Sequence, residues 1–488
     1  MRQICFLLIF YCVFFDACAQ KSTLIFRTDE DIAIRVYKPI DDTYNFYHIS
    51  DILDLKPNIS INYELDVKDF AFVQCRFPSG SRRILLVLPG DRIEIKNESD
   101  KITISGSNAE GHKYYNENYI DRGLGYYYDQ KASLIFKQHV TDTVINYDSI
   151  NYYFRQELIL PYQAELEQME MSGEITSKFS SIIAKDLYFA YSEILSVCYK
   201  NLLWGWINDK FKPTQDDIQN ILSQLSSLYE NPYSLSDESK KLPYNSIEDY
   251  YQLKYKYSDD KTKEMFTKGH TKDFYGSRPY YLMASDSMQL GLFGSQLIAD
   301  MQYGTNSFNH EKILPYLDEK FPNSEYVAII KKMTAQNQKS GNDDEIVIVN
   351  DSISSIRELM QIPGIRGKYA YIDLWGTACV PCVFEFQFND DVHKLFADYN
   401  NLVAVYISID TNRKLWEERV NKYSLKGYNI MAPKSLQEDI GMKVYNSNKV
   451  GVIPRYLLLD PEGNIINDNL PRPSRSLQLK PILADALK

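Results

Sequence analysis

Hydrophobic and polar residues alternate in several short runs between residues 20 and 107. β-branched and aromatic side chains dominate these runs, and turn residues such as Pro57-Asn58 and Pro89-Gly90 separate them. The runs are STLIFRT, DIAIRVY, FAFVQCRF, RRILLVL, RIEIK and KITISG. This pattern predicts a small antiparallel β-sandwich or barrel. The region shows no group of residues typical of a catalytic site.

From about residue 108 to 340, apolar residues recur at three- and four-residue spacing, which is the period of an amphipathic helix. The predicted helices contain YFRQELILPYQAELEQMEM, SSIIAKDLYFAYSEILSVCYKNLLWGWI, TQDDIQNILSQLSSLYE and SMQLGLFGSQLIADMQYG. Thr214, shortly before Asp216 and Asp217, is a predicted N-cap. We therefore expect a mainly helical domain here.

The polar stretch TAQNQKSGNDDE (334–345) ends the helical pattern and predicts a linker. From Tyr369 onward, strands and helices are predicted to alternate. The strands are YAYIDLW (369–375), LVAVYISID (402–410), which is apolar enough to be buried on both faces, and RYLLLD (455–460); the helices are RKLWEERVNKY and RSLQLKPILADAL. Between the first two strands, Phe384, Phe386 and Phe388 alternate as in a strand, but helical spacing continues to Tyr399. We therefore predict a helix that ends near residue 400.

These patterns predict a multidomain chain, in line with its length of 488 residues. The predicted parts are a leader at 1–19, an all-β sandwich-like domain at 20–107, a mainly helical domain at 108–340 and an α/β domain at 341–488. The formal net charge of −11 argues against nucleic acid or an anionic membrane surface as a partner.

The N-terminus has the features of a secretory signal peptide. Arg2 precedes an apolar run from Ile4 to Phe15, which is too short for a permanent membrane span. Ala17-Cys18-Ala19 fits the small-x-small cleavage pattern, with Gln20 as the first mature residue. We therefore expect export to the periplasm or cell envelope. Two alternatives are a lipoprotein lipidated on Cys18 and a buried N-terminal helix.

Cleavage leaves four cysteines of the original seven. Cys75 and Cys198 are solitary, so we expect them to be small buried hydrophobes. Cys379 and Cys382 form a Cys-x-x-Cys after a predicted strand, a spacing that suits either a zinc half-site or a redox dithiol. A structural zinc site needs four ligands, and the six scattered histidines supply no second pair, so we predict no metal.

Two tyrosine-rich stretches allow two interpretations. Tyr126-Tyr127-Tyr128 and RPYYLM (278–283) are either a surface that stacks on sugars or grips peptides, or simply core and rim. The second interpretation is the commoner situation for tyrosine.

The segment from about residue 345 to 488 resembles the thioredoxin fold and, within it, the secreted TlpA-like branch. GKYAYIDLWGTACVPCVFEF aligns with the glycine-lysine, strand, aspartate, tryptophan and Cys-x-Pro-Cys of that branch. VGVIP (450–454) stands where the family has its cis-proline loop, and RYLLLDPEGNI follows as the usual strand, turn and strand. Glu385 also stands at the family's position, three residues after Cys382. The N-terminal β region shows a weaker resemblance to domains found on such proteins.

This resemblance implies a thiol–disulfide oxidoreductase with a redox-active disulfide and no other cofactor. Cys379 is the exposed nucleophile, and an adjacent helix start favours its thiolate. Cys382 is the resolving thiol, and Asp373 is a buried acid that accepts its proton. The remaining expected site residues are Pro454, in a cis peptide bond, and Trp375, Ile453 and Val452 as substrate contacts. The implied partners are client proteins with disulfides and a membrane or envelope thiol reductant.

Some residues depart from the family pattern. Ala378 replaces an aromatic residue and Gln387 replaces a proline, and Gly376 and Thr377 are unusual, which predicts a more open site. Val380 and Pro381 bring no charge that would further stabilise a thiolate, so we predict a reductant with a potential closer to thioredoxin, at about −270 mV, than to a strong oxidant.

Two other functions are compatible with a Cys-x-x-Cys segment in a chain of this length. A peroxidase requires a Pro- and Thr-lined pocket around one cysteine, a pattern that is missing here. The second alternative is a binding module, in which residues 20–340 bind a glycan, peptide or envelope partner and the dithiol only supports that binding.

Overall fold

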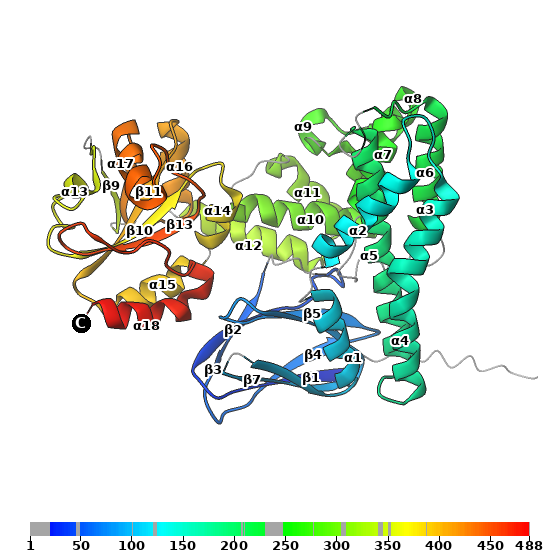
Figure 1. The fold of residues 1–488 in the computed structure, drawn as a ribbon, viewed down its shortest axis with the longest axis horizontal. Helices are drawn as coiled ribbons and strands as arrows, with labels where there is room; N and C mark the ends of the chain where they lie inside the picture. The colour runs from blue at the N-terminus through cyan, green and yellow to red at the C-terminus, as the bar shows by residue number, and fades with distance from the viewer. Residues whose placement is uncertain are drawn as a thin grey trace, which may run out of the picture.

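Figure 1 shows the fold in a computed structural model, in which β-strands, a group of helices and a C-terminal α/β part follow one another along the chain. The structure describes residues 20–44, 49–99, 101–120, 124–205, 208, 210–229, 247–276, 278–303, 309–339, 345–349, 353–386 and 388–487. The predicted leader 1–19, with Cys18, lies outside these residues, as does Gln387. Across the described ranges, no helix combines the length and the apolar character needed to cross a membrane.

The described residues from Gln20 to Gly106 form two facing four-stranded sheets, with strand orders β4-β1-β7-β8 and β3-β2-β5-β6. The strands are β1 (Gln20–Thr28), β2 (Ile32–Tyr37), β3 (Asp51–Leu55), β4 (Ile61–Val67), β5 (Ala71–Arg76), β6 (Arg82–Val87), β7 (Arg92–Glu98) and β8 (Lys101–Gly106). Side chains of both sheets, such as Phe26 and Val73, share one core. We call this part the β part.

The expectation of a wholly antiparallel arrangement is wrong, because β1 pairs with β7 in parallel while it pairs with β4 antiparallel. Parallel neighbours need a long connection, which β2 to β6 supply here. The sequence pattern also missed β3 and β4. Both are edge strands, and both carry exposed acidic residues, such as Asp54 and Glu64, that interrupt the apolar pattern. Charges of this kind protect sheet edges from pairing with other chains.

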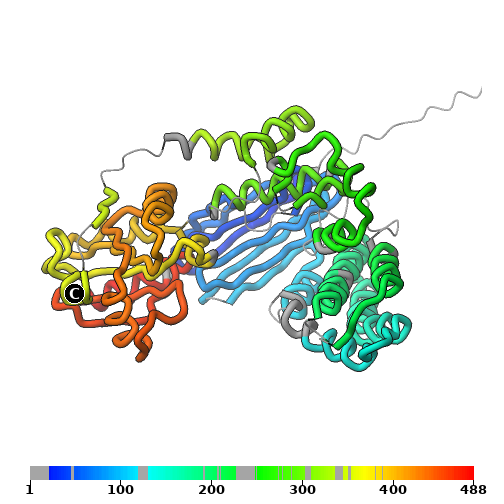
Figure 2. The backbone as a smooth tube through the Cα atoms, turned by 90° about the horizontal axis from the view of Figure 1, so that it is seen from above, coloured from blue at the N-terminus to red at the C-terminus, as the bar shows by residue number. Residues whose placement is uncertain are grey.

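The helices between Ala109 and Lys339 surround a large core that also includes side chains of the β part, such as Phe72 and Leu86. The α-helices are α1 (Ala109–Tyr115), α2 (Leu124–His139), α3 (Tyr147–Phe154), α4 (Leu160–Met171), α5 (Ser177–Leu203), α6 (Gln215–Tyr229), α7 (Ile247–Tyr257), α8 (Asp260–Thr267), α9 (Lys272–Tyr275), α10 (Asp286–Tyr303), α11 (His310–Lys320) and α12 (Glu325–Lys339). In Figure 2, strands of the β part lie between the C-terminal part and the helices drawn in cyan, whereas α10 contacts the C-terminal part directly.

Two helix predictions need correction and one is confirmed. The run 153–171 is not one α-helix, because a π-helical turn at Arg155–Ile159 separates α3 from α4, where Pro161 offers no N–H. The predicted linker starts later than expected, since 334–339 continue α12, where Ala335, Gln336 and Gln338 favour a helix. Thr214 is an N-cap: its Oγ1 accepts the N–H of Asp217 at 3.1 Å, and the Asp217 carboxylate accepts the N–H of Thr214 at 2.8 Å.

The C-terminal part has a central sheet with the strand order β14-β13-β10-β11-β12-β9. Its strands are β9 (Ile346–Ile348), β10 (Tyr369–Trp375), β11 (Leu402–Ser408), β12 (Gly427–Met431), β13 (Arg455–Leu459) and β14 (Ile465–Asn467). Strands β9, β12, β11 and β10 pair with one another in parallel. Strand β13 is antiparallel to β10, and β14 is antiparallel to β13. Strand β11 has core clusters on both faces, which confirms the prediction from its apolar run.

Helices cover both faces of this sheet. They are α13 (Ile356–Leu359), α14 (Val380–Phe386), α15 (Asn389–Phe396), α16 (Arg413–Lys422), α17 (Lys434–Tyr445) and α18 (Ser476–Ala486), with a short 3₁₀ turn, η5 (Pro473–Arg475). The helix predicted to end near residue 400 is broken, because α14 ends at Phe386 and α15 begins at Asn389. Phe386 and Phe388 are both buried, although residues two apart do not share a helix face. The break allows both rings to be buried.

Candidate active site

Cys379 and Cys382 form a disulfide where α14 begins, just beyond the end of β10. Cys379 is partly exposed, whereas Cys382 is fully buried. The backbone N–H of Cys382 donates to the Cys379 sulfur at 3.2 Å. A donor in this position stabilises negative charge on that sulfur, so the two thiols have unequal environments.

The loop between β10 and Cys379 is anchored to the end of β11. The Thr377 N–H and Oγ1 both donate to the Asp410 carboxylate at 2.7 Å. Ser408 Oγ donates to the same carboxylate at 2.5 Å. The unusual Thr377 therefore has a structural partner. Sequence reasoning missed Asp410, although its position directly after a buried strand was a usable signal.

The loop before β13 lies beside this segment. The Ile453–Pro454 peptide bond is cis, the conformation that the family resemblance implies. A Cβ atom placed on Gly376 would lie 3.4 Å from Ile453 Cδ1, which shows how closely the two loops approach. Val452 is 82% exposed, and its carbonyl accepts a hydrogen bond from Tyr445 Oη at 3.0 Å. Ile453 thus lies beside the loop that leads to Cys379, and the neighbouring Val452 has accessible surface.

Trp375 does not occupy the place expected of a substrate contact. Its side chain is fully buried and packs edge-to-face on Phe386, with ring centroids 5.2 Å apart. A residue with no exposed surface cannot touch a client in this structure. The substrate role assigned to Trp375 is therefore corrected to a core role beneath the disulfide.

Asp373 is buried in the sheet, on the same face of β10 as Trp375, where Cys382 also packs. Its neighbours in register are Tyr406 on β11 and Tyr456 on β13. Neither oxygen of its carboxyl group has a hydrogen-bond partner within the described residues. Burial, and then the charge of Glu385, raise the pKa of Asp373 well above its usual value. Because its pKa is raised, the Asp373 carboxylate is a stronger proton acceptor than an ordinary aspartate.

Glu385 is the second buried acid, one helical turn after Cys382. Ser474 of η5 donates its N–H at 2.8 Å and its hydroxyl at 3.1 Å to the Glu385 carboxylate. Arg472 lies 3.8 Å away as an ion-pair partner. The sequence analysis found Glu385 at a position of the family pattern but assigned no function to it. The segment PRPS (471–474) also resembles the family, but the contact of Ser474 with Glu385, 89 positions earlier, is not indicated by any local pattern.

The other candidates from the sequence lie in the interior or outside the described parts. Cys75 and Cys198 are buried, as predicted. Tyr280 and Tyr281 belong to the large helical core, so residues 278–283 do not form the stacking surface considered above. The side chains of 126–128 lie outside the described structure.

This fold and dithiol define the class of the C-terminal part, and comparisons with known proteins agree. Thiol-disulfide oxidoreductase ResA of Bacillus cereus is 25% identical over 107 residues, which are 22% of this chain and 57% of that protein. ResA of Bacillus subtilis is 26% identical over 109 residues, 22% of this chain and 55% of that protein. The chain thus spans little more than half the length of these curated relatives.

Among solved structures, the thioredoxin domain of a thiol-disulfide oxidoreductase from Bacteroides vulgatus is 21% identical. The match covers 26% of this chain and 84% of that chain, with a TM-score of 0.21. No family model matches the chain. The sequence similarity to ResA confirms the resemblance to TlpA-like, thioredoxin-like oxidoreductases over about a fifth of the chain.

Proposed function

We propose that the protein is a thiol–disulfide oxidoreductase that reduces disulfides of exported client proteins through Cys379 and Cys382. The observation that carries the proposal is the disulfide between a partly exposed Cys379 and a buried Cys382, next to the buried acid Asp373. The similarity to proteins named thiol-disulfide oxidoreductases supports the same reaction class.

The proposed reaction has two exchange steps. The Cys379 thiolate attacks a client disulfide, so that a mixed disulfide forms and one client sulfur leaves as a thiolate. Cys382 then loses its proton to Asp373 and attacks the Cys379 sulfur. This forms the Cys379–Cys382 disulfide and releases the second client sulfur, with two electrons passed to the client.

The expected direction and location complete the proposal. Reduction of clients leaves the protein oxidised, so a membrane or envelope thiol reductant is needed to restore the dithiol. The signal-like N-terminus supports work in the periplasm or cell envelope, as a secreted protein or as a lipoprotein through Cys18. Val452 and the backbone of Ile453 are the proposed client contacts, because an extended chain can pair with exposed backbone as an added strand.

Insulin reduction by the full-length protein, with dithiothreitol as electron source, tests this function. We expect activity in the wild type and in Cys75→Ala, and none in Cys379→Ser. The Cys382→Ser variant is expected to accumulate mixed disulfides with clients. An inactive wild type that instead binds a glycan or peptide through residues 20–340 would favour the binding-module alternative.

A further inference from the structure

Two arginines of the β part stand directly opposite each other. Arg35 on β2 and Arg76 on β5 are partners in the antiparallel register, so their side chains leave the same face of the sheet. Like charges directly opposite destabilise a sheet. Within the described residues, the only ion pair of either arginine is with the C-terminal part. The arginine pair therefore suits a partner that approaches this face.

That partner is the helix pair α14–α15, which follows the dithiol. Arg35 Nη2 lies 2.9 Å from an Asp391 carboxylate oxygen, and the Arg35 guanidinium lies 4.3 Å from the ring centroid of Phe388. The Arg76 guanidinium lies 5.6 Å from the ring centroid of Phe384, two residues beyond Cys382. Cation–π contacts of this geometry are attractive, so both guanidinium groups are stabilised by the C-terminal part.

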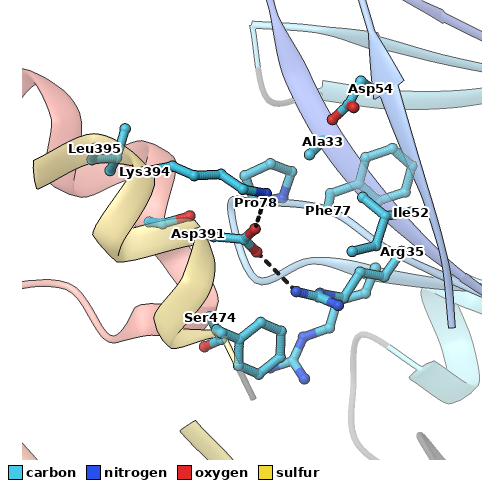
Figure 3. A pocket seen from close by; sticks show the side chains of 13 residues that line it. Ala33, Arg35, Ile52, Asp54, Phe77, Pro78, Asp391, Lys394, Leu395 and Ser474 are labelled. Carbon is cyan, nitrogen blue, oxygen red and sulfur yellow. Dashed lines mark hydrogen bonds and ion pairs between the residues drawn. The ribbon is translucent and has the colours of Figure 1, made fainter. Parts of the chain in front are cut away.

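The interface around these contacts is hollow. A cavity of about 210 Å³ lies between the outer face of the β part and α15. Figure 3 shows the side chains that line it, with the Arg35–Asp391 pair among them. Phe77 and Pro78 line it from the β part, and Leu395 lines it from α15. The cavity interrupts the packing around the arginine contacts, and a separate contact between α10 and α14 also joins the C-terminal part to the rest of the chain.

A second contact joins the β part to η5. Gly80, in the turn between β5 and β6, has φ +87°, and a Cβ atom placed on it would lie 2.7 Å from Arg475 Nη2. Arg475 is the last residue of η5, next to Ser474, which holds the Glu385 carboxylate. The β part thus touches the segment that orients one of the two buried acids of the site.

We infer that the β part positions the proposed redox site, and that Arg35 and Arg76 are the positioning residues through which it does so. The inference deepens the proposed function and rests on it. In the docked arrangement, the β part holds α14, α15 and η5 together, which keeps Glu385 buried near Asp373. When docking fails, η5 loosens, water enters, and Glu385 turns towards solvent.

Carbon-13 NMR titration of the Asp373 carboxyl group in the oxidised full-length protein tests this inference. We expect the Arg35→Ala, Arg76→Ala double variant to lower the titration midpoint by about half a pH unit or more. Greater hydration and a weaker charge from Glu385 both lower the pKa of Asp373, so the two effects have the same sign. Hydrogen exchange of the Ser474 amide is expected to quicken. The matched control is Lys21→Ala, which removes an exposed ion pair with Glu64 in the same part.

Charge reversal provides a rescue. Arg35→Asp alone is expected to shift the titration midpoint of Asp373, and Arg35→Asp combined with Asp391→Arg is expected to restore it. If the double alanine variant does not fold, these two charge-reversal variants test the inference instead. An unchanged midpoint and unchanged Ser474 exchange in the folded alanine variant, or failure of the rescue, overturns the inference. The titration needs no client, so a wild type that reduces no disulfide contradicts the proposed function separately.

Discussion

Asp373 and Glu385 come from different elements, strand β10 and helix α14, yet both are buried and the charge of Glu385 raises the pKa of Asp373. Burial makes the larger contribution to this shift. The two buried acids therefore interact close to Cys382, where we propose that Asp373 accepts the proton of the resolving thiol.

In the reduced protein, Cys379 is expected to react with iodoacetamide faster than Cys382. Cys379 is partly exposed, and its sulfur accepts an N–H bond that favours the thiolate, whereas Cys382 is fully buried. Mass-mapped alkylation over time measures both rates, and the buried Cys75 and Cys198 provide internal controls. Faster labelling of Cys382 would reverse the two assigned roles.

Asp373→Asn is expected to slow release of the mixed disulfide, because the proton acceptor for Cys382 is lost. General acid–base contributions of this kind are about 100- to 10,000-fold at most. Single-turnover measurements from pH 6 to 9 check the rate, with the exposed Asp66→Asn as the control. Equal rates in wild type and Asp373→Asn would leave Asp373 with a structural role only.

The stability of the oxidised protein is expected to carry a pH dependence from Asp373. Its folded pKa is raised, so the folded state keeps a proton that the unfolded state releases above about pH 3.9. The stabilisation is present below that pH and is lost as pH rises towards the folded pKa, by at most about 1.4 kcal/mol per pH unit. Urea unfolding at several pH values gives the free energy of unfolding of the wild type and of Asp373→Asn. The difference between the two isolates the contribution of Asp373. A flat difference would contradict the raised pKa.

Thr377→Val is expected to destabilise the oxidised protein by about 1 kcal/mol, the usual net worth of one hydrogen bond. The substitution removes the bond from Thr377 Oγ1 to Asp410 and keeps the bond from the backbone N–H. Urea unfolding measures the loss, and the exposed strand position Thr103→Val serves as the control. Equal stability in the two variants would mean that the Asp410 contact contributes nothing.

The mature protein is expected to begin at Gln20 and to be found outside the cytoplasm. N-terminal sequencing and fractionation of cells that express the full chain check both points. A mature chain that begins at a lipid-modified Cys18 would establish the lipoprotein alternative. Retention of residues 1–19 in a cytoplasmic protein would contradict export.

Local sequence pattern predicted much of the C-terminal part and its dithiol. Strands β10 and β13 follow apolar runs, and Cys379, Cys382 and Pro454 stand in a family order that can be read directly. The edge strand β9 and the strand β12 escaped detection, because runs of 3 and 5 residues are too short to show a clear period. The break after Phe386 also escaped detection, because helical spacing continues across it while burial of two rings decides against one helix.

The sequence by itself determined the position and order of Cys379 and Cys382 and the position of the acid Asp373, because all three lie in one continuous segment whose motif can be read without the fold. Only the tertiary structure decided that Trp375 is a core residue, that Ser474 holds Glu385, and that Arg35 and Arg76 meet Phe388 and Phe384. The partners in the last two contacts stand far apart along the chain. Periodicity describes which face a residue takes within its own element, whereas the packing of separate elements determines what that face meets.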